Sequence, residues 1–263
     1  MYFFIFNGTF TFKILETINY IIKSATIIDP KSIFHGQKKD VFIKGNKIID
    51  IKKKISIKEP FIEIKSKNLH ISPGFIDMHT RIGEPGLEFK EDFHSALNAA
   101  SNGGFTGVVH MPNTIPPIQN SSDISFILKK SEKNIVDVFP TGCLTKNMEG
   151  TEITEMYDMI KSGAVAFTDD KKSIENTMLM NIAMEYAQQF NTTIMCTCYD
   201  KNLCNEGELN EGIFSTLLGL KGIPEIAEEI RIARDIDLTE YSKGKIHIST
   251  VSTKKSLNLI KQA

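Results

Sequence analysis

Residues 72–81 read SPGFIDMHTR, and the character of the sequence changes at this stretch. Before it, residues 19–71 contain short apolar runs of β character, and Gly45 and Asn46 stand between two of them as in a hairpin turn. After Pro73 and Gly74, short apolar runs alternate with amphipathic stretches. This alternation is typical of βα units arranged around a parallel sheet.

Six such units can be counted after residue 73. We expect strands at 75–79, 105–110, 135–140, 164–168, 192–197 and 245–250, with helices near 91–102, 122–132, 153–162, 176–190 and 224–242. A closed barrel of this type has eight units. The sequence therefore predicts an α/β fold, an incomplete TIM-type (β/α) barrel preceded by a small N-terminal β module. The expected segments are an N-terminal extension at 1–18, the β module at 19–72 and a truncated barrel at 73–263.

Composition excludes several classes of protein. The 263 residues carry a formal net charge of −1 with scattered basic side chains, so a partner that is nucleic acid or an anionic membrane is not expected. The four cysteines follow no secretory signal, and we expect reduced thiols in a cytoplasmic protein. The apolar residues 1–12 are too short to span a bilayer and are expected to form an extra strand, or to reflect an upstream start of translation.

A series of local strings carries a family resemblance. Besides residues 72–79, they are EPGLEFKED at 84–92, GGFT at 103–106, MPNT at 111–114, AFTDD at 166–170, NEG at 210–212, GIP at 222–224, ARD at 233–235 and VST at 251–253. In this order they resemble the dihydroorotase branch of the amidohydrolase superfamily. The resemblance implies a zinc-dependent interconversion of N-carbamoyl-L-aspartate and L-dihydroorotate in pyrimidine synthesis.

The family's metal site begins with a His-x-His pair, and the matching residues here are His79-Thr80-Arg81. Side chains two apart on a strand share a face, so two imidazoles at this spacing can reach one ion. Arg81 instead brings a guanidinium that stays protonated and has no lone pair to donate. We expect it to pair with the carboxylate of Asp170, which matches the family's metal-bridging aspartate.

Other positions of the resemblance are also changed. Thr197 and Thr250 stand where the family has two further histidine ligands, and Gly83 stands where it has an arginine that holds the substrate carboxylate. The substrate-contacting asparagine is retained as Asn113. His247 lies three residues before Thr250, so on a regular strand it is expected to face the outer helices. The general base belongs to the eighth strand, beyond the six counted.

Three functions are compatible with these residues. The favoured hypothesis is a dihydroorotase-like protein without catalytic residues, in which His79 and Asp170 are remnant metal ligands and zinc is absent or substoichiometric. It is expected to form a homo-oligomer or a complex, for which the resemblance makes aspartate transcarbamoylase a candidate partner. The alternatives are an active zinc-dependent cyclic amidohydrolase with a rebuilt site, and a noncatalytic module that binds an anionic ligand through Arg81 and Asn113.

Cys196 and Cys198 could be imagined as replacement ligands for the lost histidines. They flank Thr197, however, and on a regular strand they must face away from the barrel mouth. His94 and His110 lie outside the inherited ligand pattern and are expected to be structural. Gly103 and Gly104 are expected to end a helix, because they lack the spacing of a phosphate-binding loop.

Overall fold

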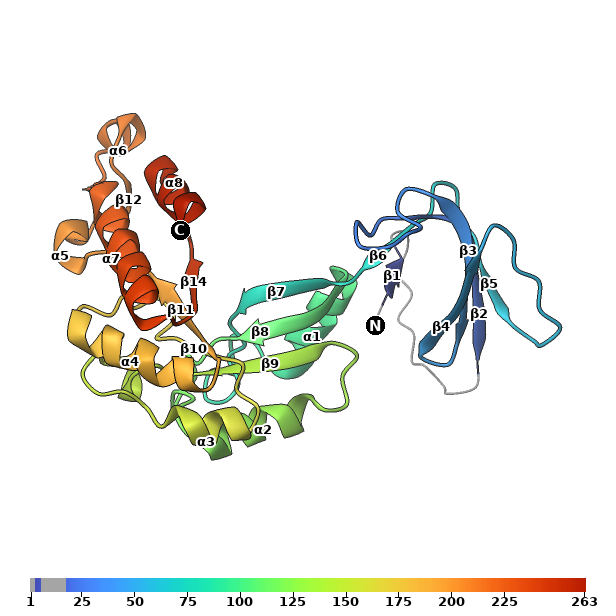
Figure 1. Cartoon of the computed structure of the whole chain (residues 1–263), viewed down its shortest axis with the longest axis horizontal. Coiled ribbons are helices and arrows are strands. Elements are labelled where there is room, and N and C mark those ends of the chain that lie inside the picture. Colours follow the sequence, from blue (N-terminus) through green and yellow to red (C-terminus); the bar gives the residue numbers. More distant parts are fainter. Residues whose placement is uncertain (1–2, 6–17) are drawn as a thin grey trace. The chain divides into compact units, whose positions relative to one another are not determined.

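The structure is a computed structural model, and it describes residues 3–5 and 18–263 (Figure 1). The chain divides into two compact units. The first contains Met1–Met78, His94–Val108 and Asn134–Asp137, and the second contains His79–Phe93, Val109–Lys133 and Val138–Ala263. No helix among the described residues is long and apolar enough to cross a membrane.

The first unit contains a small β-sheet with the strand order β1-β6-β2-β3-β4, in which β5 also pairs with β2. Its strands are β1 (Phe3–Ile5), β2 (Asn19–Ile27), β3 (Lys38–Lys44), β4 (Lys47–Lys52), β5 (Ile62–Ile64) and β6 (His70–Pro73). Gly45 joins β3 to β4 with a positive φ of 58°, which confirms the predicted hairpin turn. Buried aliphatic side chains, among them Ile22, Val41 and Ile71, form the core of this sheet.

The expected N-terminal extension is described only in part. Its residues 3–5 form β1, which pairs antiparallel with β6 as an extra strand. Residues 1–2 and 6–17 lie outside the described residues.

Six strands form a second sheet in the order β14-β11-β10-β9-β8-β7. They are β7 (Phe75–Thr80), β8 (Phe105–His110), β9 (Asp137–Gly142), β10 (Ala166–Phe167), β11 (Thr193–Thr197) and β14 (Ile246–Ser249). The predicted fold class is confirmed, since the six strands make a parallel half-barrel and a small β-sheet precedes them. Parallel strands bring their carboxyl ends to one edge, where this kind of sheet places its functional residues.

Five helices follow the strands at nearly the expected positions, and α8 follows β14 after them. They are α1 (Phe93–Asn102), α2 (Ser121–Ser131), α3 (Met156–Lys161), α4 (Thr177–Gln189), α7 (Ile226–Ser242) and α8 (Lys254–Gln262). Side chains of Asn120, Asn176 and Thr253 accept hydrogen bonds from the first turns of α2, α4 and α8. Pro224 is not the first helical residue that its position suggested, because Glu225 caps α7 and Pro224 precedes that cap.

The sequence did not predict the elements between β11 and α7. The chain forms α5 (Lys201–Cys204), β12 (Leu209–Asn210), α6 (Ile213–Leu218) and β13 (Gly222–Ile223) there. Strands β12 and β13 pair in parallel as a separate two-stranded sheet. They carry α6 between them, and we call residues 212–220 the tip segment. A short 3-10 turn, η1 (Lys146–Met148), was also not predicted.

Candidate functional site

One face of the parallel sheet is defined by a cluster of apolar side chains. Val109, Met111, Ala166 and Met195 pack together on it from the β8, β10 and β11 regions, and Phe139 of β9 packs against them. Thr197 lies two residues after Met195 on β11 and therefore on the same side, and Asn113 and Asp170 follow the ends of β8 and β10. We call this side the inner face, and its carboxyl end carries the residues that the sequence singled out.

His79, Arg81 and Asp170 meet at this end of the sheet. Asp170 Oδ1 lies 2.9 Å from His79 Nε2 and 2.8 Å from Arg81 Nη2, and Arg81 Nε donates to both oxygens at 3.1 and 2.9 Å. Arg81 Nη2 also lies 3.2 Å from His79 Nε2. The predicted Arg81–Asp170 pair is therefore present, with His79 as a third member. We call these residues the Arg81 triad.

The backbone holds Asp170 in an unusual conformation. Its φ is +53°, and its backbone N–H donates a hydrogen bond to Thr168 Oγ1 at 3.0 Å. Thr197 Oγ1 donates to the Asp170 carbonyl at 2.5 Å. Burial alone raises the pKa of Asp170, but the hydrogen bonds from His79 and Arg81 and the charge of Arg81 outweigh it and lower that pKa below its ordinary value. The carboxylate is therefore charged at neutral pH and committed to Arg81.

A cleft of about 410 Å³ opens beside the triad. Arg81 and Asp170 form part of its wall together with Asn113, so the two predicted substrate-binding residues line one cleft. Asn113 Oδ1 is buried there and has no hydrogen-bond partner among the described residues. Lys90 and Lys171 also line the cleft, and the sequence analysis missed both. Lys171 could have been predicted to lie near the cleft, because it directly follows Asp170 in the sequence.

Gly83 lies in a tightly folded loop whose backbone approaches it closely. A Cβ atom at this position would lie 2.3 Å from the carbonyl oxygen of Leu87 and 2.8 Å from that of Glu91. Lys130 Nζ holds Glu84 of the same loop at 2.8 Å, and the Phe93 amide donates to that carboxylate at 3.2 Å. The position that the resemblance assigns to a carboxylate-binding arginine therefore has no room for any side chain unless the loop moves.

The residues at the remaining ligand positions of the family pattern, Thr197 and Thr250, do not come together as a metal site. The hydroxyl of Thr197 donates its hydrogen bond to the Asp170 carbonyl, and Thr250 is exposed with a φ of +55° after β14 has ended.

The prediction that His247 faces the outer helices is wrong. His247 is the cross-strand partner of Met195, which belongs to the inner-face cluster, and cross-strand partners share a face. Burial and the nearby His79 lower the pKa of His247.

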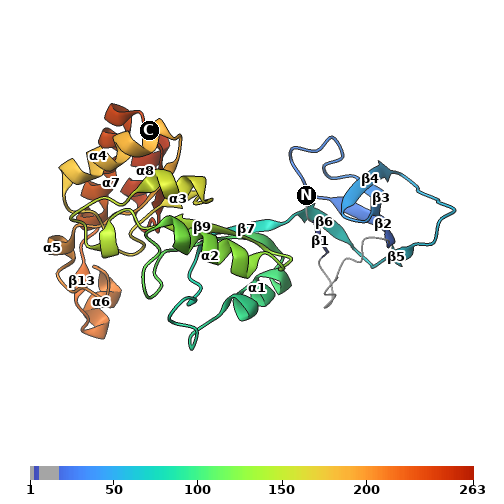
Figure 2. The same cartoon turned by 90° about the horizontal axis from the view of Figure 1, so that it is seen from below.

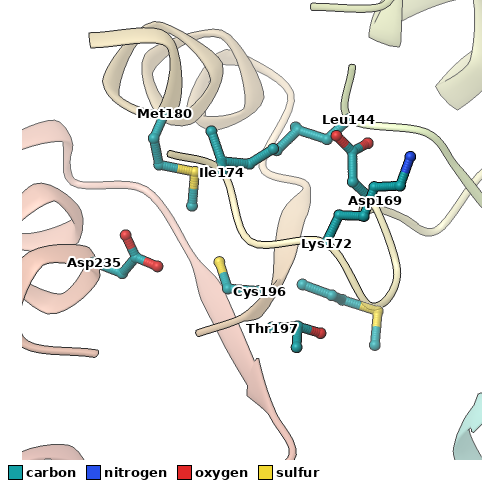
Figure 3. A pocket seen from close by; sticks show the side chains of 9 residues that line it. Leu144, Asp169, Lys172, Ile174, Met180, Cys196, Thr197 and Asp235 are labelled. Atoms are coloured by element: carbon teal, nitrogen blue, oxygen red, sulfur yellow. The ribbon is translucent and has the colours of Figure 1, made fainter. Parts of the chain in front are cut away.

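Cys196 and Cys198 face away from the inner face, as predicted. Cys198 Sγ donates to Asp235 Oδ2 of α7 at 3.3 Å. Figure 3 shows Cys196 directed towards Asp235 and Met180, beside a cavity with about 10 Å³ of space, enough for one water molecule. The contact with Cys196, together with burial, raises the pKa of the Cys198 thiol. Neither thiol is available to the Arg81 triad.

His94 and His110, which the sequence analysis expected to be structural, lie outside the Arg81 triad. His110 is fully buried and makes an edge contact with the Phe93 ring at 5.6 Å between centroids. Burial lowers the pKa of His110 to about 4, so its imidazole is neutral at physiological pH. His94 Nε2 lies 3.1 Å from Asn98 Nδ2 on an exposed face of α1.

Comparison with known proteins shows the family. A family model described as dihydro-orotase-like matches residues 69–256, which is most of the chain. The chain belongs to the dihydroorotase-like family. The dihydroorotase of Acetivibrio thermocellus is 39% identical over 244 residues, covering 92% of this chain and 57% of that protein. The dihydroorotase of Aquifex aeolicus is 42% identical over 244 residues, with the same coverage of both.

Solved structures agree at the level of the fold. The L-hydantoinase (dihydropyrimidinase) from Arthrobacter aurescens superposes with a TM-score of 0.74 at 19% identity, covering 94% of this chain and 56% of that one. A D-hydantoinase gives a TM-score of 0.70 at 19% identity, covering 93% of this chain and 55% of that one. This dihydroorotase-like chain thus spans little more than half the length of the relatives and structures that it matches.

The metal that the family uses does not fit the residues present in this dihydroorotase-like chain. Catalytic zinc sites need at least three protein ligands, usually nitrogen, sulfur or carboxylate donors. Within residues 3–5 and 18–263, no group of three or more His, Cys, Asp or Glu side chains could hold a metal ion. Where the pattern has its second imidazole, the guanidinium of Arg81 binds the same carboxylate that a metal would need.

Proposed function

We propose that this chain is a noncatalytic dihydroorotase-like protein of pyrimidine biosynthesis. The observation that carries the proposal is the Arg81 triad, in which a permanent cation occupies the carboxylate of Asp170. Because guanidinium does not deprotonate near neutral pH, it can neither donate a lone pair to a metal nor accept a proton from water.

Chemical requirements support this proposal. Hydrolysis of a cyclic amide needs an activated water molecule and a base that takes its proton. Asp170 is a poor base here, because its low pKa favours the charged, Arg81-bound form. The residues of this cleft therefore support binding better than hydrolysis.

The test combines elemental analysis with a dihydroorotate hydrolysis assay on the purified chain. We expect well under one zinc ion per chain and no hydrolysis above the uncatalysed rate. Arg81→His serves as the matched variant, since it restores the inherited His-x-His spacing and should increase zinc uptake without restoring activity. One or more tightly bound zinc ions per wild-type chain, together with measurable hydrolysis, would instead establish the active amidohydrolase with a rebuilt site.

A second candidate function is the binding of a small anionic ligand in the cleft. No described residue accepts a hydrogen bond from Arg81 Nη1, although the other guanidinium nitrogens are occupied. Lys90 and Lys171 form no ion pair with a described residue. With the buried, unpartnered oxygen of Asn113, these groups could receive a carboxylate that also carries a hydrogen-bond donor.

A thermal-shift comparison separates this candidate from a protein with no ligand. Dihydroorotate should raise the unfolding temperature, whereas dihydrouracil, which lacks the carboxylate, should leave it unchanged. Lys171→Gln should weaken the shift, and Lys129→Gln on the exposed side of α2 is the control. Equal shifts with both compounds, or none with either, would contradict an anion site.

The proposed partner is a further part of this hypothesis. Aspartate transcarbamoylase acts in the same pathway, and the family resemblance makes it the first candidate. Co-elution of the two purified proteins on size-exclusion chromatography tests the complex directly. Separate elution at micromolar concentrations of both would remove this partner from the proposal.

A further inference from the structure

Helix α6 has its polar and apolar sides reversed relative to a surface helix. Ile213, Phe214, Leu217 and Leu218 are 76%, 75%, 74% and 65% exposed. Ser215, in contrast, is buried, and its hydroxyl donates to the Gly212 carbonyl at 2.8 Å. Surface helices normally turn their apolar side chains towards the core. Here the large apolar side chains face outward.

The four exposed side chains lie on one side of the helix. Their spacing of i, i+1, i+4 and i+5 corresponds to an arc of about 140° at 100° per residue. Helix α6 lies at the periphery of its unit, beyond β12 in Figure 1 and beyond β13 in Figure 2. The side chains thus form one continuous surface, which we call the α6 patch.

The base of the tip segment is anchored, so the patch is held in place. Glu211 N donates to the Ile223 carbonyl at 2.8 Å, and Asn210 Nδ2 donates to Ser252 Oγ at 3.3 Å. Gly219 ends the helix in the left-handed conformation with a φ of +66°. A rigid presentation lowers the entropy cost of association.

We propose that the α6 patch is a self-association surface at which two copies of this chain meet about a two-fold axis. The four side chains expose on the order of 600 Å² per copy, which is at the upper limit for an apolar patch on a monomer. Two such surfaces in contact bury about 1,200 Å² in all, which reaches the lower bound of specific interfaces.

The charge pattern favours a second copy as the occupant. The tip segment, residues 212–220, contains no charged side chain, so a two-fold contact brings no like charges together. Glu211 and Lys221 flank the segment and are exposed, which gives the apolar centre a polar rim. The inference is independent of the proposed function, because the patch shares no residue with the cleft.

The experiment measures the mass of the full chain by sedimentation from low to high micromolar concentration. Wild type should form dimers, and Phe214→Glu with Leu217→Glu should raise the dissociation constant at least about 100-fold. Met178→Glu on α4 is the matched control, since Met178 is 73% exposed but lies outside the patch. It should leave the dimer unchanged.

Other routes to association give different results. Strands β7 and β14 are the outermost strands of the parallel sheet in the described part of the chain, and pairing through either of their edges would be unaffected by the double substitution. A double variant that associates as strongly as wild type therefore overturns the proposal, as does a wild-type chain that stays monomeric throughout. Circular dichroism checks folding, and the milder pair Phe214→Ser with Leu217→Ser repeats the test if the acidic pair fails to fold.

Discussion

Replacing Arg81 with alanine tests whether the Arg81 triad stabilises the fold. Removing one member of a fully buried ion pair costs about 3–5 kcal/mol, because the remaining charge is left buried without its partner. The side chain of Asp170 is 7% exposed and that of Arg81 is 31% exposed, so water partly screens the pair. His79 also remains as a hydrogen-bond partner. We therefore expect Arg81→Ala to lower the free energy of unfolding by about 2 kcal/mol.

The assay is urea unfolding followed by circular dichroism, since the chain contains no tryptophan. Arg81→Leu combined with Asp170→Asn removes both charges and should cost only about half as much as Arg81→Ala. Lys146→Ala is the control, because the Lys146–Glu152 pair is more than half exposed on both sides and its loss should cost under about 0.5 kcal/mol. A change at Arg81 no larger than that control, or a double variant that is no milder, would refute a partly buried pair.

Two further predictions follow from the same region. Gly83→Ala should lower the free energy of unfolding by about 1–3 kcal/mol, because its Cβ would overlap the Leu87 carbonyl. Gly212→Ala is the control and should change the free energy of unfolding little, because the space around a Cβ at that position is open. Equal effects of the two substitutions would contradict the close approach at Gly83. Acid should weaken the triad, since a carboxyl with a lowered folded pKa stabilises above its unfolded pKa of about 3.9 and loses that contribution as the pH falls through the folded value. Asp170→Asn should therefore flatten the stability profile below about pH 4, and a profile identical to wild type would show that Asp170 is not the group responsible.

The Arg81–Asp170 pair was predicted from the family resemblance together with residue spacing. His79 and Arg81 are two apart at the end of one strand, and Asp170 follows the end of another, so parallel strands bring all three to one edge. A long guanidinium beside a buried carboxylate then has an obvious partner. The prediction needed the match of Asp170 to the family's metal-bridging aspartate as well as strand alternation and the charge of each group, and it did not name His79 as a partner.

His247 shows where that reasoning fails. The prediction counted alternate faces backwards from Thr250 as if the strand were regular there. The structure ends β14 at Ser249 and turns Thr250 to a φ of +55°, so the count began outside the strand. Nothing in the local sequence marked this threonine, because β-branched residues rarely adopt a positive φ.

The structures of the tip segment and of the Gly83 loop could not be predicted from the sequence, for a different reason. Strands β12 and β13 have two residues each and α6 has six, and these lengths are too short for a periodic pattern to be recognised. At Gly83, the sequence shows that an arginine of the family pattern is missing, but not that the Leu87 carbonyl lies in its place. That contact depends on how the loop folds back, which composition does not encode.

The guanidinium of Arg81 also changes what the fold depends on. A metal bound only by the native state contributes stability that rises with the free metal concentration, by mass action. Arg81 is attached to the chain by its own backbone, so the cation facing Asp170 cannot dissociate or be removed by a chelator. Under the proposed function, folding of this site does not depend on metal supply, and we expect the unfolding temperature of the chain to be the same with added zinc as with a chelator.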